Sequence, residues 1–382
     1  MESYGFLGFH TRKVKTPSYI LDERLLENNL HILDSVQKRT GCSILLALKG
    51  YAMWSTFPQV KKYLKGICAS GLNEARLGYE KFGKEVHVFS PAYKEEEFKE
   101  IIRYADYIIF NSFSQWEKFK KIIPKKIKCG LRVNPEYSEI KVKLYNPCAK
   151  NSRLGIMLKE FKGKDLTGIT GLHFHAMCEQ NSDTLERVIR VYEKKFGKYI
   201  KKMQWVNFGG GHHITRKDYD VNRLVKIINS FRKKYNNINV YLEPGEAVAL
   251  NSGILVASVL DIVNNGMDIA ILDTSAEAHM PDVIAMPYRP NVVGANIPNK
   301  KKYTYRLAGN TCLAGDVIGD YSFSKPLKVG DKLIFLDMAI YSMVKNTTFN
   351  GINLPSIAIF TKKKKLKVIK EFGYKDYMER LS

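Results

Sequence analysis

Short apolar runs recur through the first two thirds of the chain and alternate with segments whose apolar residues are spaced as on one face of a helix. The clearest amphipathic segment is 220–235, where Leu224, Ile228, Phe231 and Tyr235 repeat at helical spacing. The apolar runs are too short for helices and are typical of strands buried on both faces. We expect such strands at 44–48, 66–69, 86–89, 107–110, 129–133, 169–174, 205–208 and 240–242. Eight strands that alternate with helices predict a (β/α)8 barrel of the TIM type.

After Gly253 the pattern changes to shorter β-like stretches separated by turns. We expect these later strands at 254–263, 268–272, 303–308, 332–336 and 356–360. Another short strand, at 16–21, precedes the barrel. The sequence therefore predicts an α/β chain with a barrel over 23–252 and a mostly β domain over 253–382, which residues 1–22 join.

The net charge of +23 raises the question of a nucleic-acid partner. The positive charge comes from 46 lysines and only 15 arginines, and the lysines are scattered in pairs instead of forming one patch interleaved with aromatic residues. The lysine run at 362–365 is typical of a solvated turn. We therefore expect no nucleic-acid function.

The sequence indicates neither a membrane span nor a disulfide framework. No apolar run approaches the thickness of a bilayer, and the first residues lack the basic-then-apolar start of a secretory signal. The six cysteines include no CxxC pair, which argues against a zinc knuckle and favours free thiols. We expect a soluble, cytoplasmic protein with no bound metal and no membrane partner.

Chemically distinct groups stand at the ends of the predicted barrel strands, where barrel enzymes place their active sites. They are an amine, a guanidinium, an imidazole, a glycine triplet and a carboxylate, supplied by Lys49, Arg132, His175, Gly209–Gly211 and Glu243. Strands that lead into loops often end in polar residues, but this general tendency does not explain five chemically different groups at five strand ends. We predict the active site at this end of the barrel.

Lys49 and the glycine triplet each allow an ordinary and a functional interpretation. Lys49 is either a solvated residue that begins a loop or an amine in a partly dry pocket, where desolvation lowers its pKa and makes it nucleophilic. Gly209, Gly210 and Gly211 form either a tight turn or a loop whose N–H groups approach a phosphate. The triplet matches neither GxGxxG nor the P-loop, so a nucleotide is not favoured. A lysine and a phosphate loop across one barrel mouth suggest pyridoxal phosphate, held by Lys49 as a Schiff base.

Three more residues allow the same two kinds of interpretation. Glu243 either caps the Pro-Gly turn that follows it or keeps the pyridine nitrogen protonated, so that the ring withdraws electrons from Cα. His175 is either a core histidine or an imidazole stacked on the cofactor ring. Cys312, in a loop over 310–316, is either structural or a proton donor.

These residues belong to a longer set of short motifs that runs in order from about Thr16 to Gly351. The set is Ala47-Leu-Lys49, Cys68-Ala-Ser70-Gly, Leu131-Arg132, His175, Gly209-Gly-Gly211, Glu243-Pro-Gly245, Cys312, Met338-Ala-Ile-Tyr341 and Thr348-Phe-Asn-Gly351. As a set it resembles the fold-type III, alanine racemase-like pyridoxal-phosphate decarboxylases, the group of the ornithine, diaminopimelate and carboxynorspermidine decarboxylases. The resemblance implies a cofactor-binding barrel joined to a β domain.

The resemblance also implies a role for each matching residue. Lys49 would form the Schiff base, His175 would stack on the ring and Glu243 would pair with the pyridine nitrogen. Arg132 would lie near the ring. The phosphate would be held by Gly209, Gly210, Gly211 and Tyr341. Cys312 would donate a proton to Cα, and its loop would reach the active site of the other subunit of a homodimer.

Two departures from the wider family narrow the substrate. Relatives that act on ornithine or diaminopimelate have arginine after Glu-Pro-Gly, whereas this chain has Glu246. The segments 273–282 and 286–290 resemble the carboxynorspermidine/carboxyspermidine branch. A carboxylated polyamine has a cationic tail, so its site needs acids in a protein whose overall field repels cations. Besides Glu246 the candidate acids, each of which is as readily a turn or ion-pair residue, are Asp273, Glu277, Asp282 and Asp316.

The resemblance therefore implies decarboxylation of carboxynorspermidine and carboxyspermidine to norspermidine and spermidine, a step of polyamine biosynthesis. Decarboxylation of diaminopimelate, or of another basic amino acid, is the alternative within the same class of enzyme. A protein that binds pyridoxal phosphate without turnover is the alternative from another class. The second domain, with Cys312 and Tyr341, argues against that last alternative.

Overall fold

The computed structural model describes residue 11 and residues 14–382, and the chain divides into two compact units. One unit is Asn28–Val248, and the other comprises Ala249–Ser382 together with the described residues up to Glu27. These boundaries lie a few residues from those expected at 23 and 252. Of the N-terminal segment that we expect to join the β domain, residues 1–10, 12 and 13 lie outside the described residues.

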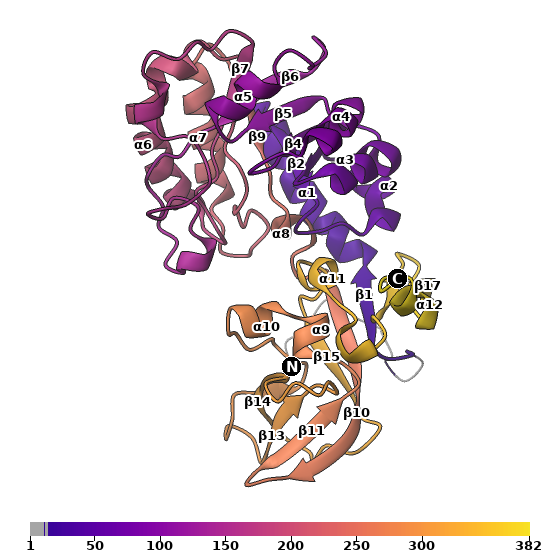
Figure 1. Ribbon diagram of the computed structural model, residues 1–382. Helices are drawn as coiled ribbons and strands as arrows, with labels where there is room; N and C mark the ends of the chain where they lie inside the picture. The colour runs from indigo at the N-terminus through magenta and orange to yellow at the C-terminus, as the bar shows by residue number, and fades with distance from the viewer. Residues whose placement is uncertain (1–10, 12–13) are drawn as a thin grey trace. The chain divides into compact units, whose positions relative to one another are not determined.

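The first unit contains a closed barrel of eight parallel strands in chain order, which confirms the predicted fold (Figure 1). Each predicted strand agrees with an observed one to within one residue at either end. The observed strands are β2 (Ser43–Ala47), β3 (Gly66–Ala69), β4 (Glu85–Phe89), β5 (Tyr107–Phe110), β6 (Lys128–Arg132), β7 (Ile169–His173), β8 (Trp205–Asn207) and β9 (Asn239–Leu242). The barrel closes where β2 pairs with β9, with Ile44 opposite Leu242.

Helices surround the barrel (Figure 1), and most of them follow a strand. They are α1 (Glu23–Thr40), α2 (Phe57–Val60), α3 (Leu72–Leu77), the π-helical η3 (Gly78–Phe82), α4 (Glu95–Tyr104), α5 (Phe113–Phe119), α6 (Ser182–Ile200), α7 (Val221–Lys234) and α8 (Glu246–Ala249). The amphipathic segment predicted at 220–235 forms helix α7. Asp220 caps this helix by accepting a hydrogen bond from Arg223 N at 2.8 Å. No helix among the described residues is long and apolar enough to cross a membrane.

The indole of Trp205 fills much of the barrel interior, together with the buried side chains of Leu45, Tyr107, Ile109 and Tyr241. Glycines on the two preceding strands make room for it. A Cβ at Gly171 would lie 2.0 Å from the ring, and one at Gly130 would lie 2.4 Å away. The interior is thus a packed core, and a ligand has room only beyond the strand ends.

The second unit is built on a nine-stranded sheet, as the change of pattern after Gly253 predicts. Its strands are β1 (Ser18–Asp22), β10 (Gly253–Asn264), β11 (Asp268–Leu272), β12 (Ala295–Asn296), β13 (Tyr303–Ala308), β14 (Val317–Phe323), β15 (Lys332–Leu336), β16 (Ser356–Phe360) and β17 (Leu366–Lys370). The N-terminal β1 lies between β10, which is antiparallel to it, and β16, which is parallel. The predicted lysine-rich turn joins β16 to β17 and is closed by Thr361 N donating to Lys365 O at 2.9 Å.

Short helices complete this unit, at α9 (Ala276–His279), α10 (Asp282–Ala285), α11 (Ser342–Lys345) and α12 (Tyr374–Met378). The sequence did not predict β12, β14 or β17. β14 contains Gly319 and Asp320, residue types that are depleted in strands. β17 carries mainly exposed side chains, so it lacks the apolar run by which the other strands were found.

Candidate active site

Lys49 stands at the barrel mouth, just beyond β2, in a turn closed by Gly50 N donating to Ala47 O at 3.0 Å. Its side chain is exposed, so this structure gives no sign of the desolvation that we considered for a nucleophilic amine. A Cβ on Gly50 would lie 3.0 Å from Gly245 Cα and 3.2 Å from Glu246 N. The lysine turn therefore packs closely on the segment that follows β9.

The glycine triplet after β8 packs against the residues that follow β7. Gly209 and Gly211 have φ angles of 69° and 81°, a region that favours glycine. A Cβ on Gly209 would lie 2.4 Å from Phe174 O, and one on Gly211 would lie 2.0 Å from Met177 O. Only glycine fits these two positions without moving backbone, which makes the triplet more than a simple turn.

Two of the N–H groups in the triplet are already used inside the barrel. Gly209 N donates to Asn207 Oδ1 and Gly210 N donates to His175 Nδ1, both at 2.8 Å. Because Nδ1 accepts, a neutral His175 carries its proton on Nε2. Burial lowers the pKa of His175 well below its usual value, and the positive charges of neighbouring side chains lower it further. An anion at this loop would therefore meet Gly211 and a neutral imidazole, not three free N–H groups.

Glu243 is a buried carboxylate that the surrounding residues keep ionised. Asn207 Nδ2 donates to Glu243 Oε1 at 2.7 Å, and His173 Nε2 lies 3.4 Å from Oε2. Burial alone would raise the pKa of Glu243, but His173, His87 and the Asn207 amide together lower it to about 2. The result is a fixed negative charge at the end of β9, suited to hold a proton on a nitrogen base.

Arg132 provides a second buried charge, at the end of β6. Its side chain is 6% exposed and its guanidinium lies 4.5 Å from the centre of the Phe89 ring. Burial lowers the pKa of Arg132 to about 10, so the side chain still carries its charge at neutral pH.

Two residues near Lys49 were given no role from the sequence, although Cys68 belongs to the motif set quoted above. Glu74, in the first turn of α3, accepts a hydrogen bond from Ser70 N at 2.6 Å. Burial raises the pKa of Glu74, while the Ser70 hydrogen bonds and the charge of Lys49 oppose that rise. Burial also raises the pKa of Cys68 well above its usual value, and the Glu243 carboxylate adds to the effect. Glu74 could have been selected from the sequence because it is a carboxylate in the first helical turn after a barrel strand.

Cys312 and Tyr341 lie in the second unit. The Cys312 side chain is exposed, and its loop is held by Cys312 N donating to Asn350 Oδ1 at 2.7 Å. Tyr341 has a φ of 45° and a ψ of −53°, a conformation that non-glycine residues rarely adopt. Residues in such strained conformations are concentrated at ligand sites, where the surrounding structure holds them in place.

Most of the acids considered for the polyamine tail also lie in this unit, and three of them have partners there. Asp316 is buried and accepts hydrogen bonds from Ser275 Oγ at 2.9 Å and from Thr311 Oγ1 at 2.6 Å. Asp273 accepts one from Ser258 N at 2.7 Å. These carboxylates hold loops together, which leaves them less free for a ligand.

Asp282 and Glu277 differ in whether another residue engages their carboxylates. Asp282 forms an ion pair with Lys345. The Glu277 carboxylate, in contrast, has no hydrogen bond or ion pair with any other described residue, and its side chain is partly exposed. Of the four candidate acids in this unit, Glu277 is therefore the one whose carboxylate no other described residue engages.

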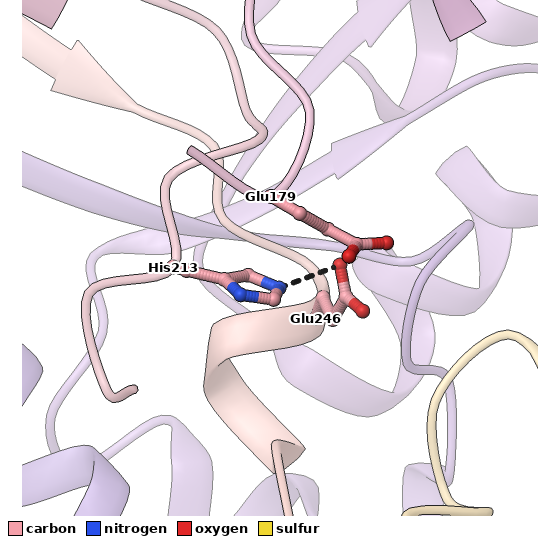
Figure 2. Close-up of side chains that lie close together, drawn as sticks. All are labelled: Glu179, His213 and Glu246. Atoms are coloured by element: carbon pink, nitrogen blue, oxygen red, sulfur yellow. Dashed lines mark ion pairs between the residues drawn. The ribbon is translucent and has the colours of Figure 1, made fainter. Parts of the chain in front are cut away.

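Glu246 belongs to a cluster in the barrel unit that the sequence did not reveal as a group. Figure 2 shows its carboxylate directed toward His213 and Glu179. Each of the three side chains offers one ligand atom, and these atoms lie within 4.8 Å of one another. We refer to these three residues as the Glu246 cluster.

The arrangement at the barrel mouth fits pyridoxal phosphate. Lys49 can attach an aldehyde, the ionised Glu243 can hold a proton on the pyridine nitrogen, and the neutral His175 offers a flat face. Glycine at positions 209 and 211 lets the triplet pack directly on the residues that follow β7, which brings the triplet and His175 together at the barrel mouth. These residues come from β2, β7, β8 and β9, all at the C-terminal end of the barrel.

Comparisons with known proteins point to one family. A family model described as "Pyridoxal-dependent decarboxylase, C-terminal sheet domain" matches residues 18–339. The carboxynorspermidine/carboxyspermidine decarboxylase of Campylobacter jejuni is 51% identical over 379 residues, which cover 96% of this chain and 99% of that protein. The carboxyaminopropylagmatine decarboxylase of Synechocystis sp. is 43% identical and covers 96% of this chain and 95% of its own.

A solved structure agrees with these sequence matches. The crystal structure of carboxynorspermidine decarboxylase complexed with norspermidine, from Campylobacter jejuni, superposes with a TM-score of 0.91 at 49% identity. The match covers 96% of this chain and all of that one. Diaminopimelate decarboxylases are distant, with identities of 23% and 26% for two of them.

Proposed function

Because this chain belongs to the pyridoxal-dependent decarboxylase family, we propose that it decarboxylates carboxynorspermidine and carboxyspermidine to norspermidine and spermidine. The observation that carries the proposal is the 51% identity, over nearly the full length of both chains, to an enzyme of that name. The diaminopimelate decarboxylases lie much further away in sequence, so the alternative activity is not favoured.

The residues of the barrel mouth supply what such a reaction requires. When bound, pyridoxal phosphate supplies a ring that accepts the electrons left on Cα as the carboxyl group departs. The Lys49 amine holds the cofactor, and the Glu243 carboxylate keeps a proton on the ring nitrogen. His175 packs as a neutral imidazole, so it adds no charge that would compete with that proton. The family resemblance adds two residues of the second unit, with Cys312 as the donor that would return a proton to Cα and Tyr341 as a further contact to the phosphate.

The test is a substrate panel scored for CO2 release. Carboxynorspermidine and carboxyspermidine should exceed diaminopimelate by orders of magnitude in kcat/KM, because the acid Glu246, and not an arginine, follows the Glu-Pro-Gly turn. Comparable values for diaminopimelate would refute the proposal. Carboxyaminopropylagmatine joins the panel as a second candidate substrate, because a relative with 43% identity is named for it.

We further propose that the enzyme works as a homodimer with shared active sites, in the cytoplasm. Its six free cysteines suit a reducing compartment. The dimer proposal rests on the family resemblance, in which the loop of Cys312 completes the site of the partner subunit. A two-fold interface would repeat this contact in both directions.

Mixed dimers test the shared site. Lys49→Ala and Cys312→Ala chains, each inactive or weak alone, should complement when they are coexpressed, because one of the two sites in a mixed dimer then has both wild-type residues. Random assembly makes about half of the dimers mixed, so about a quarter of all sites should recover. Verified mixed dimers with no activity beyond that of the parents would show that each chain builds its site alone.

A further inference from the structure

The motif Thr348-Phe-Asn-Gly351 belongs to the set that carries the family resemblance, but none of its residues has a role in the proposed reaction. It contains the short helical turn η6 (Phe349–Gly351), which lies in the same unit as Cys312. The asparagine of the motif reaches the cysteine loop, because Cys312 N donates to Asn350 Oδ1 at 2.7 Å. This hydrogen bond joins two loops that lie far apart in the sequence.

The backbone at Asn350 has an uncommon conformation. Its φ is 56° and its ψ is 15°, which is the left-handed region. Asparagine tolerates this region better than most other residues that carry a Cβ. Gly351, the next residue, also has a positive φ, of 74°. Two successive residues with positive φ turn the chain sharply, and at this turn the Asn350 amide oxygen meets the Cys312 N–H.

Other hydrogen bonds of the cysteine loop fix the residues on either side of Cys312. Thr311 Oγ1 donates to the buried Asp316 carboxylate at 2.6 Å, and Leu313 N donates to Thr311 Oγ1 at 3.4 Å. Asn350 adds a hydrogen bond to Cys312 itself. Because the Cys312 side chain is exposed, packing does little to fix its direction, and the backbone hydrogen bond matters more.

The C-terminal helix α12 packs on the asparagine turn. A Cβ on Gly351 would lie 3.5 Å from the Tyr377 ring, so little space separates the ring from the turn. Arg380 Nε donates to Thr348 Oγ1 at 3.0 Å, and Thr348 is only 5% exposed. The last residues of the chain therefore support the turn that holds the cysteine loop.

We propose that Asn350 is a positioning residue for Cys312 and that α12 keeps Asn350 in place. This inference rests on the proposed function, in which the Cys312 thiol donates a proton to Cα. A proton donor works only within hydrogen-bond reach of the atom that receives the proton, so a displacement of about 1 Å already lowers the rate. Asn350 acts only through Cys312 and touches neither substrate nor cofactor in this role.

Two substitutions of Asn350 separate the acceptor from the backbone conformation. Asn350→Gly tolerates the positive φ but removes the acceptor, whereas Asn350→Asp keeps an acceptor oxygen. With carboxynorspermidine as substrate, kcat should fall about tenfold in the glycine variant, while KM and the affinity for pyridoxal phosphate stay within about twofold of the wild type. The aspartate variant should retain most of the wild-type kcat. A wild-type kcat in Asn350→Gly would overturn the proposal.

A double variant shows whether Asn350 acts through the thiol. Cys312→Ala removes the thiol and should itself lower kcat. Adding Asn350→Gly to Cys312→Ala should then cause no further loss, because the group that Asn350 positions is already absent. If Asn350→Gly lowered kcat equally with and without the thiol, the effect would be a general structural one and the positioning role would have to be abandoned.

Two tyrosines of α12 provide a matched pair for the role of that helix. Tyr377→Ala removes the ring that lies against Gly351, whereas Tyr374→Ala removes a ring that is 74% exposed. The Tyr377 variant should lower kcat severalfold, and only when Cys312 is present, while the Tyr374 variant should leave kcat unchanged. Equal kcat values for these two variants would overturn the role of α12.

The wild type and Cys312→Ala separate this inference from the proposed function. A wild type that releases no CO2 from carboxynorspermidine would overturn both, because the inference depends on that reaction. A near-normal kcat in Cys312→Ala would overturn the proton-donor role and the inference with it. A large loss in Cys312→Ala beside a normal Asn350→Gly would overturn the inference alone. Far-UV circular dichroism and the cofactor absorbance verify that each variant is folded and loaded.

Discussion

The glycine at position 211 allows a sharp test of the phosphate loop. Gly211→Ala would place a Cβ 2.0 Å from Met177 O at a φ of 81°. The left-handed conformation alone costs an alanine about 1–2 kcal/mol. The contact adds to this cost, because a carbon and a carbonyl oxygen normally stay more than 3 Å apart, so either the triplet or the loop after β7 must move by about 1 Å. A displacement of that size at a ligand site costs on the order of 10²-fold in function.

Gly83→Ala provides the matched control, because Gly83 has a φ of 68° in the same unit but nothing within 4 Å of an added Cβ. Gly83→Ala should lose about 1–2 kcal/mol of stability, measured by urea unfolding, from the backbone strain alone, and Gly211→Ala should lose more, because the contact with Met177 O adds to that strain. Only Gly211→Ala should lose affinity for pyridoxal phosphate, by about 100-fold in a titration followed by absorbance. A Gly211→Ala protein that binds the cofactor as tightly as Gly83→Ala does would refute the phosphate loop.

Three further predictions concern single residues. Borohydride reduction of the loaded enzyme should fix the cofactor on the Lys49 peptide, and a label on another lysine would contradict that attachment. Glu243→Gln should bind cofactor but lose about 10²–10³ in kcat, since it removes an electrostatic stabiliser, and a near-normal kcat would exclude the electron-sink role. Burial lowers the pKa of His212 from 6.5 to about 4, although the Phe208 and Gly209 backbone opposes this. Its neutral form therefore contributes stability that is complete above pH 6.5 and is lost as the pH falls toward 4, roughly 3 kcal/mol in all, and His212→Gln should flatten this part of the urea-unfolding profile.

The barrel was predictable from the sequence because each of its strands is an apolar run that ends at a polar residue. Parallel strands are covered on both faces, so nearly every residue in β2 or β5 is buried and the run is continuous. β14 and β17 lack this signal, because a sheet with one solvated face tolerates glycine, aspartate and lysine. β13 and β15 are also buried mainly on one face but were predicted, so one-sided burial alone does not account for the missed strands.

Some features of the candidate site could also be predicted from the sequence, and others could not. Lys49, His175 and Glu243 could be selected because each directly follows a barrel strand. The partners that set the charge state of Glu243 could not, because Asn207 and His173 lie far from it in the sequence and reach it only through the closed barrel. The partners of Asp316 were likewise not predictable, because one of the two residues whose hydroxyls it binds, Ser275, lies far from it in the sequence.

Glu243 and Glu246, two carboxylates of the barrel mouth, differ in their surroundings. Glu243 is buried among donors, so its charge is fixed and can serve only a group that reaches the end of β9, such as a ring nitrogen. Glu246 lies nearer to solvent, with His213 Nε2 at 3.0 Å from its Oε2. Relatives that act on ornithine or diaminopimelate place an arginine at this second position. If the acid at position 246 selects the substrate as the resemblance implies, Glu246→Arg should change substrate preference while Glu243 keeps the chemistry at Cα, and an unchanged preference in the substrate panel would refute this.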